Sequence, residues 1–362
     1  MKKKFLYFFQ IFFTILILIP NQSLADSNTI TSDSSTQQDI DGDGEFLTVK
    51  DNSTLATGAT TKAANVTGDS VDVTVESGST ISANTVAVFG DDTSDLTVTN
   101  SGTITASGTT AIDVKGTTDA TITNSSGGTI SSNRNTIRIS KTGSNNTTGM
   151  TITNSGTITA SNGSAIFASD SNSTATITNK IGGEITNSDT SNAAIRAGAS
   201  STIVNSGKIT NDVGNDAIKL YGNNATITLK DGGIVVGKID GLLRSGSKLK
   251  FNHGVGQGYF YETEGNFTLE DLDGNQVVKG SAGSVGQGGN ENIDELLGYK
   301  SLNIRKSLDK FLKSEGFKNN KTEWQGIQAT SLERKENTKN LALGYEFYSL
   351  GLNIMRPSEN EN

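Results

Sequence analysis

The chain has 362 residues, of which 41 are Gly, 2 are Pro and none is Cys, and hydrophobic residues make up only 33% of it. Its formal net charge is −8. This composition excludes a disulfide framework, a thiolate metal site, a Cys nucleophile and a large core of Leu and Phe. The acidic balance argues against nucleic acid as a partner, because phosphate binding needs clustered Lys and Arg. A folded chain of this kind buries small β-branched side chains in many thin layers.

The first 25 residues have the pattern of a secretory signal peptide. Lys at positions 2–4 precedes an apolar run over 5–19, Pro20 breaks the run, and Ser23 and Ala25 provide the small residues of a cleavage site. An uncleaved membrane anchor is the alternative, because the run is of borderline length. Removal of segment 1–25 takes away three Lys and no acid, so the mature net charge becomes 27 − 38 = −11. We therefore expect export to the cell surface, the outer membrane or the extracellular space.

An acidic run in the N-terminal segment 26–64 is a weak candidate for calcium binding. Four carboxylates take odd-numbered positions of a calcium-type loop, namely Asp39, Asp41, Asp43 and Glu45. Gly44 stands at the sixth position as such loops require, but Lys50 takes the twelfth, where a bidentate Glu is expected. The alternative is a solvated turn before a strand at 46–49. No other ligand pattern occurs, so we expect no cofactor.

Residues 65–245 repeat one unit of about 25 residues. The near-identical strings T-V-T-N-S-G-T-I-T-A-S and T-I-T-N-S-G-T-I-T-A-S begin at Thr97 and Thr151. A first apolar anchor recurs at Val73, Val98, Ile122, Ile152, Ile177, Ile203 and Ile227. A second recurs at Ile81, Ile104, Ile130, Ile158, Ile185, Ile209 and Val235, and a third at Val86, Ile112, Ile137, Ile166, Ile195 and Ile218. Seven copies of the unit follow, each with up to three short β-prone segments.

These units predict an all-β chain built as a right-handed parallel β-helix of about seven coils. Residue-by-residue alternation of Thr with Ile fits a pleated strand, and Gly and Ser-Gly pairs supply the corners. Three short strands repeated in constant order stack on their own copies, and parallel crossovers prefer the right hand. An array of β-sandwiches is the alternative, but it would need antiparallel hairpins with two-residue turns, and few such turns are present.

A row of asparagines two residues after the first anchor supports the stack. Its members are Asn100, Asn124, Asn154, Asn179 and Asn205. An inward Asn can hydrogen-bond to its equivalents in the coils above and below, which satisfies a buried amide. We therefore expect a structural ladder with no catalytic role, since Asn is neither an acid nor a base.

Together the signal peptide, the Cys-free body rich in Ser, Thr, Asn and Gly, and the T-I-T-N-S-G-T-I units resemble autotransporter passenger domains of Gram-negative bacteria. The resemblance covers residues 65–245 and is specific for the fold more than for an activity. Such passengers are adhesins, surface structures or, less often, proteases and lipases. No motif of those enzymes occurs in this chain.

The period stops after about residue 245. Residues 246–290 read as longer strands and turns, a C-terminal cap that would cover the last coil. Apolar residues at near-helical spacing predict a helix within 291–315, either the linker that threads a translocation barrel or a helix docked on the cap. Residues 316–362 resemble the first hairpin of an outer-membrane barrel, with strands at 324–332 and 341–354. Two strands cannot close a barrel. A truncated or split reading frame and a soluble cap are the two interpretations, so outer-membrane contact would come only through a missing or separately encoded barrel.

Chemistry beyond the scaffold has few candidates. The charges on the third strand, Asp113, Arg138, Arg196 and Lys219, would stack on one exposed face, either as a carbohydrate-cleaving site or as a solvated face. Between residues 65 and 240 the aromatic residues are Phe89, Phe167 and Tyr221, and the one His of the chain, His253, lies in the cap with no obvious partner.

We therefore predict a non-enzymatic, exported β-helix that acts as an adhesive or structural module at the cell surface. Its partner is an unidentified surface ligand, which can be a glycan, a cell or the matrix. The alternative is a polysaccharide lyase or depolymerase on the same scaffold.

Overall fold

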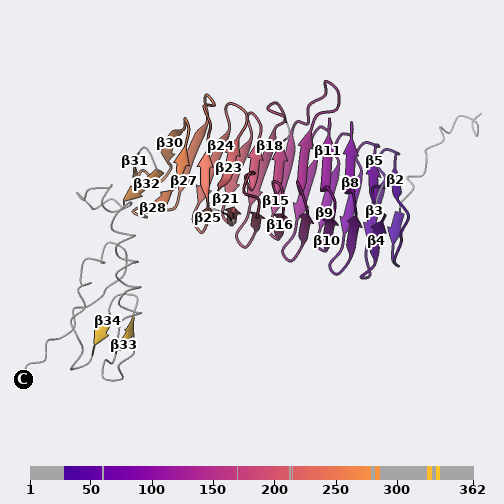
Figure 1. Ribbon diagram of the computed structural model, residues 1–362, viewed down its shortest axis with the longest axis horizontal. Helices are drawn as coiled ribbons and strands as arrows, with labels where there is room; N and C mark the ends of the chain where they lie inside the picture. Colours follow the sequence, from indigo (N-terminus) through magenta and orange to yellow (C-terminus); the bar gives the residue numbers. More distant parts are fainter. Residues whose placement is uncertain are drawn as a thin grey trace, which may run out of the picture. The chain divides into compact units, whose positions relative to one another are not determined.

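A computed structural model describes residues 28–58, 61–168, 170–211, 213, 215–278, 282–285, 324–327 and 332–334 (Figure 1). In these ranges strands are the one kind of regular element, so the described chain holds no helix that could span a membrane. The described residues fall into two compact units, one formed by residues up to 251 together with 263–268, the other by 252–262 and the residues from 269 onward. The predicted signal peptide 1–25 and the helix predicted within 291–315 lie outside the described residues.

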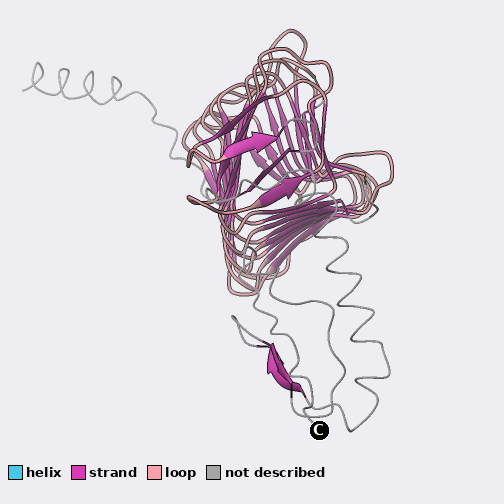
Figure 2. Cartoon of the chain, turned by 90° about the vertical axis from the view of Figure 1, so that its left-hand side faces the viewer, coloured by secondary structure: helices cyan, strands magenta, loops and turns pink. Residues whose placement is uncertain are grey.

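The first unit is a parallel β-solenoid of about nine turns. Each turn from β3 to β26 adds one strand to each of three sheets, so neighbouring strands in a sheet come from successive turns. Figure 2, turned by 90° from Figure 1, shows the strands of successive turns stacked into three walls around the interior. The predicted parallel β-helix is confirmed, while its hand remains a prediction.

The strands of each sheet follow in register along the stack. The first sheet contains, in order, β1 (Asn28–Ile30), β3 (Phe46–Val49), β6 (Asp72–Val75), β9 (Thr97–Asn100), β12 (Thr121–Asn124), β15 (Met150–Asn154), β18 (Ala175–Asn179), β21 (Thr202–Asn205), β24 (Thr226–Lys230) and β27 (Lys248–Asn252). The second contains β4 (Thr54–Thr57), β7 (Thr80–Ala83), β10 (Thr103–Ala106), β13 (Thr129–Ser132), β16 (Thr157–Ala160), β19 (Glu184–Asn187), β22 (Lys208–Asn211) and β25 (Ile234–Val236). The third contains β2 (Gln38–Ile40), β5 (Ala64–Val66), β8 (Val86–Asp91), β11 (Thr110–Lys115), β14 (Ile137–Ser140), β17 (Ile166–Ala168), β20 (Ile195–Ala197), β23 (Asp216–Leu220), β26 (Lys238–Asp240) and β29 (Thr263–Glu264).

The expected number of seven coils is too low, because strands before residue 66 join the same sheets. Leu47 of β3 pairs in register with Val73, and Leu55 of β4 pairs with Ile81. Both leucines are fully buried, so they continue the inward rows. The sequence repeat does not reveal the first turns, because Leu takes the place of the usual Val or Ile anchor and no Asn follows two residues later. Parallel pairing depends on the alternation of buried and exposed positions, which these strands retain.

The interior is built from the aliphatic anchors, which have 0–1% of their surface exposed in the first two sheets from Val73 to Ile227. One anchor of the third row is corrected. Val88, which is fully buried, pairs with Ile112, whereas Val86 is half-buried and pairs with Thr110. Strand β8 starts two residues before the core position, and Val86 belongs to that extension.

The second unit contains short antiparallel pairings. Strands β28 (Tyr259–Tyr261), β32 (Ala282–Val285) and β31 (Gln276–Val278) form a three-stranded sheet in that order. Strand β30 (Thr268–Asp271) runs from the first unit into the second along the chain. Farther on, β33 (Trp324–Ile327) pairs with β34 (Leu332–Arg334). The strand predicted over 341–354 lies outside the described residues.

Candidate functional site

In the middle turns, two of the three outward faces of the solenoid carry mainly Thr and Ser. Successive turns of the first sheet present Thr97, Thr99, Thr121, Thr123, Thr151, Thr153, Thr176 and Thr178. The second sheet presents Thr103, Thr105, Thr129, Ser131, Thr157 and Thr159. Such hydroxyl rows repeat with the coil and suit a pleated, half-exposed surface. They form scaffold surface.

The third sheet differs, because its outward row changes chemistry from turn to turn. Except at the two ends of the row, each member follows a buried aliphatic residue by one position, and each pairs in register with the next. We call it the third-sheet row; it comprises Asp39, Asn65, Phe89, Asp113, Arg138, Phe167, Arg196, Lys219, Asp240 and Glu264. The four predicted charges Asp113, Arg138, Arg196 and Lys219 all lie in it. Of the aromatic residues, Phe89 precedes Asp113 in the row, and Phe167 lies between Arg138 and Arg196.

Asp113 and Arg138 form a bidentate ion pair on adjacent strands β11 and β14. Arg138 donates from Nε to Oδ1 of Asp113 at 2.8 Å and from Nη2 to Oδ2 at 2.5 Å. Only 1% of Asp113 is exposed, so its charge is compensated almost entirely by this one guanidinium. Two parallel charge-assisted hydrogen bonds of this kind fix geometry as well as charge. Both carboxylate oxygens are thus occupied.

Phe89 lies beneath two lysines. The Lys62 Nζ atom lies 3.3 Å from the ring centroid and the Lys115 Nζ atom lies 5.1 Å from it. Lys62 also donates a hydrogen bond to Oδ1 of Asn65, the preceding member of the row, at 2.8 Å. Burial is the main cause that lowers the pKa of Lys62. The ring, 6% exposed, therefore holds two cations above one strand.

Arg196 is flanked by an aromatic ring from each neighbouring turn. Its guanidinium carbon lies 4.6 Å from the ring centroid of Phe167 and 3.3 Å from that of Tyr221, which follows β23. All three side chains are half-buried. The Nε atom is buried and has no hydrogen-bond partner. Burial lowers the pKa of Arg196, although an arginine remains charged at neutral pH.

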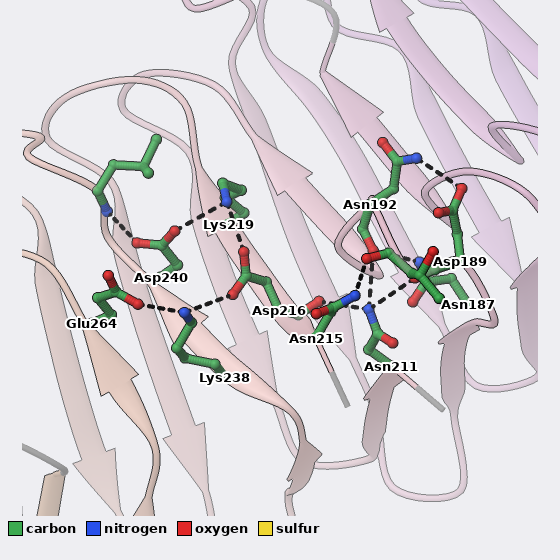
Figure 3. Close-up of polar contacts among 12 residues, drawn as sticks. Asn187, Asp189, Asn192, Asn211, Asn215, Asp216, Lys219, Lys238, Asp240 and Glu264 are labelled. Atoms are coloured by element: carbon green, nitrogen blue, oxygen red, sulfur yellow. Dashed lines mark hydrogen bonds and ion pairs between the residues drawn. The ribbon is translucent and has the colours of Figure 1, made fainter. Parts of the chain in front are cut away.

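Lys219 continues the row into a chain of ion pairs (Figure 3). Its Nζ atom lies 2.7 Å from Oδ2 of Asp216 and 3.1 Å from Oδ2 of Asp240. Lys238 Nζ lies 3.5 Å from the other oxygen of Asp216 and pairs with Glu264. The hydrogen bond from Lys219 to Asp216 is the largest cause that raises the pKa of Lys219. Both lysines at this end of the row are thus paired with carboxylates, of which there are three.

Figure 3 also shows a polar group around Asn187 and Asn211, which the sequence analysis did not predict. Asn187 and Asn211 are fully buried at the ends of β19 and β22, where earlier turns carry Ala160 and Ser132. The Asn211 amide donates to the backbone carbonyls of Asn192 at 3.0 Å and Asp216 at 3.2 Å. These bonds hold a corner between the second and third sheets. The signal in the sequence was the recurring I-T-N at 185–187 and 209–211.

The predicted asparagine row forms a continuous ladder inside the first sheet. The side-chain amide of each member donates to the side-chain oxygen of the next, at 2.8 Å from Asn100 to Asn124 and from Asn124 to Asn154. The distance is 2.9 Å from Asn154 to Asn179 and from Asn179 to Asn205. All five side chains are fully buried. Because each amide oxygen except the first accepts from its neighbour, the row fixes the register of adjacent turns.

Three of the four carboxylates of the weak calcium candidate accept separate hydrogen bonds. Asp39 accepts from the side chain of Asn65 at 2.9 Å, Asp43 accepts from the backbone of Asp69 at 3.1 Å, and Glu45 accepts from the backbone of Gly42 at 3.0 Å. Across the described ranges no three His, Asp or Glu side chains come together as metal ligands would. Asp41 takes part in none of these three hydrogen bonds.

His253 of the second unit has partners that the sequence did not reveal. Its Nε2 atom lies 3.1 Å from the hydroxyl oxygen of Tyr261, and its ring stacks on that of Tyr261 with centroids 5.7 Å apart. Tyr259 packs against the same imidazole and donates to Asp271 at 2.9 Å. Burial raises the pKa of Tyr261 to about 12. The group is a packed polar cluster of the antiparallel sheet.

Comparisons of the chain with family models, curated proteins and solved structures found no match. The functional interpretation therefore depends on the chain's own geometry. The feature that separates one face from the others is the third-sheet row.

Proposed function

We propose that this protein is an exported, non-enzymatic β-helical module that adheres to a surface ligand through the third-sheet row. The observation that carries the proposal is the contrast between walls. All three aromatic residues of the repeat region, Phe89, Phe167 and Tyr221, lie along the third sheet, interleaved with cations, while the middle turns of the other two walls present mainly Thr and Ser. A repeat that keeps its inward anchors and varies one outward row has a defined recognition face on a rigid support.

Adhesion also agrees with the form of the scaffold. A solenoid presents a long, regular surface, and extended surfaces of this kind are what repeat proteins use for binding. Aromatic and Arg side chains are enriched at protein recognition surfaces. Export is supported by the N-terminal sequence pattern. The resemblance to autotransporter passengers stays part of this proposal.

The test uses the full chain in a binding assay with cells and immobilised glycans. We expect retention that falls when Phe167→Ala alters the row or when Lys62→Gln removes the cation above Phe89. The matched control is Thr123→Ala on the first sheet, which removes a half-exposed side chain from another wall and is expected to bind as the native chain does. Equal loss in the control, or no retention by the native chain, would refute the role of the row.

A polysaccharide-active enzyme is the second candidate, because Asp113 is a buried carboxylate beside an arginine on an outward face. Both of its oxygens are engaged by Arg138, which favours a structural role. The assay is release of reducing ends or unsaturated products from polysaccharide by the full chain. Cleavage that disappears in Asp113→Asn would establish the enzyme and end the adhesive interpretation. Intact polysaccharide in the presence of retained binding supports adhesion.

A further inference from the structure

The three cations of the third-sheet row differ in what neutralises them. Arg138 pairs with Asp113, and Lys219 lies between Asp216 and Asp240. Arg196, which stands between those two positions, forms no hydrogen bond or ion pair with any described residue. Its contacts are the two aromatic rings. The row therefore holds one positive charge without an acidic partner in the described chain.

The surroundings of Arg196 prepare it to bind an anion. Phe167 and Tyr221 restrict the guanidinium from the turns before and after, so little conformational freedom remains to be lost on binding. Aromatic faces stabilise the charge but accept none of its N–H groups as a carboxylate would. A planar guanidinium offers donors in a fork that fits the paired oxygens of a carboxylate or a sulfate. The positive charge and its fixed orientation, which an oxyanion site needs, are thus present before the ligand binds.

We propose that Arg196, held by Phe167 and Tyr221, binds the carboxylate or sulfate groups of an acidic polysaccharide lying along the third-sheet row. The proposal rests on the proposed adhesive function and names the class of its ligand. The row runs across successive turns at about 4.8 Å each, so its ligand is extended. Two aromatic residues, Phe89 and Phe167, lie among charged and polar members of the row, which suits a chain of sugar rings with spaced charges. The net charge of −8 opposes unspecific capture of polyanions, so binding depends on this local site.

The experiment measures retention of the full chain on three immobilised polysaccharides, namely polygalacturonate, dextran sulfate and neutral dextran, with soluble polyglutamate as a competitor. We expect binding to at least one acidic polymer, weakening with added salt, and none to dextran. The polymer that binds decides between the carboxylate and the sulfate. Arg196→Gln is expected to raise the dissociation constant at least about tenfold, because it removes charge-assisted hydrogen bonds to the ligand. Arg196→Lys keeps the charge but not the fork, so its loss is expected to be smaller.

Two matched variants separate recognition from unfolding. Lys208→Gln removes one positive charge from the second sheet, where Lys208 lies 3.9 Å from Glu184, and is expected to bind as the native chain does. Tyr221→Phe keeps the ring and is expected to retain binding, whereas Tyr221→Leu is expected to weaken it. Urea midpoints equal to that of the native chain establish that each variant is folded.

The outcomes distinguish this inference from the function beneath it. Binding to cells or dextran with no binding to either acidic polymer overturns the inference and leaves adhesion standing. Acidic binding that Arg196→Gln does not change overturns the inference as well. Equal competition by polyglutamate reassigns the ligand from polysaccharide to acidic protein and overturns it too. Absence of all binding overturns both proposals, and cleavage of the bound polymer overturns only the non-enzymatic function.

Discussion

Val75 occupies, one turn before Asn100, the position that asparagine takes in the five turns that follow. The two residues pair in register on β6 and β9. Because Val75 has no amide to donate, Oδ1 of Asn100 is buried without a hydrogen-bond partner. At the other end of the ladder, Leu229 pairs with Asn205. The ladder thus begins and ends at aliphatic residues. Among the side-chain oxygens of the ladder, one, the orphan Oδ1 of Asn100, is buried without a hydrogen bond.

This arrangement predicts that the cost of losing an asparagine depends on its place in the ladder. In Asn154→Val the oxygen of Asn179 loses its donor while that of Asn100 stays orphaned, so two buried oxygens are unsatisfied. In Asn100→Val the orphan moves one turn to Asn124 and the number of orphans stays at one. We expect Asn154→Val to lower the free energy of unfolding by about 1–3 kcal/mol more than Asn100→Val does. Urea denaturation of both variants measures the difference, and equal losses would contradict the ladder.

A second prediction concerns the corner glycines beside the ladder. A Cβ atom at Gly156 would lie 2.2 Å from the carbonyl oxygen of Gly128 and 2.5 Å from that of Ser125. Both obstacles are backbone, so Gly156→Ala must displace a turn, and we expect it to lower the free energy of unfolding by about 1–3 kcal/mol. Gly58, around which there is open space, is the matched control. Gly58→Ala is expected to change stability by less than about 0.5 kcal/mol. The measurement is the urea midpoint, and an unaffected Gly156→Ala protein would show that the corner has room.

The fold could be predicted from the sequence because one pattern repeats with constant order. Alternation of Ile and Thr fixes which residues of each strand face inward, and the register of β9 with β12 follows that alternation. The first turns could not be found in the same way, since Leu47 and Leu55 carry the anchors without the repeated string. The repeated string T-I-T-N-S-G-T-I marks turns that are similar in sequence, whereas a strand joins the sheet if it has an apolar residue at the inward position.

The third-sheet row could be predicted only in part. Its charges were found because they lie one residue after an Ile anchor, as Arg196 follows Ile195. The sequence names Phe89 but does not place it in the row, because an anchor at Val86 puts the outward position at Ala87, whereas the true anchor at Val88 puts it at Phe89. The partners of each charge could not be predicted, since they depend on how side chains meet across turns. Nothing in the spacing distinguishes the paired Arg138 from Arg196.

A third prediction follows from the ion pairs around Lys219. Asp216 and Asp240 raise the pKa of Lys219 in the folded protein above its ordinary value of 10.5. The folded state therefore gains stability from this lysine at pH values below 10.5 and loses it as the pH rises through the raised pKa. We expect Lys219→Met to cost about 1–2 kcal/mol at pH 7, because Asp240 is only 5% exposed while Lys219 is partly solvated and screened.

Urea denaturation across the alkaline range checks this prediction. The difference between the native chain and Lys219→Met is expected to shrink as the pH rises above 10.5. Lys208→Met is the control, because its pairing with Glu184 is long and exposed and should contribute little at any pH. A difference that stays constant up to strongly alkaline pH would exclude the ion pairs as the source of the stability.

The last prediction concerns the two members of the row that neutralise each other. In Arg138→Met the carboxylate of Asp113 stays buried with no compensating charge, and we expect a loss of about 3–5 kcal/mol. In Asp113→Asn the remaining guanidinium is 34% exposed in the native chain and can turn to water, so a smaller loss is expected. The double variant removes both charges, and its loss is expected to be smaller than that of Arg138→Met alone. A double-mutant cycle by urea denaturation measures this coupling. Strictly additive losses would mean that the pair contributes no coupling, and Asp113 would then lack the structural role that separates it from a catalytic acid.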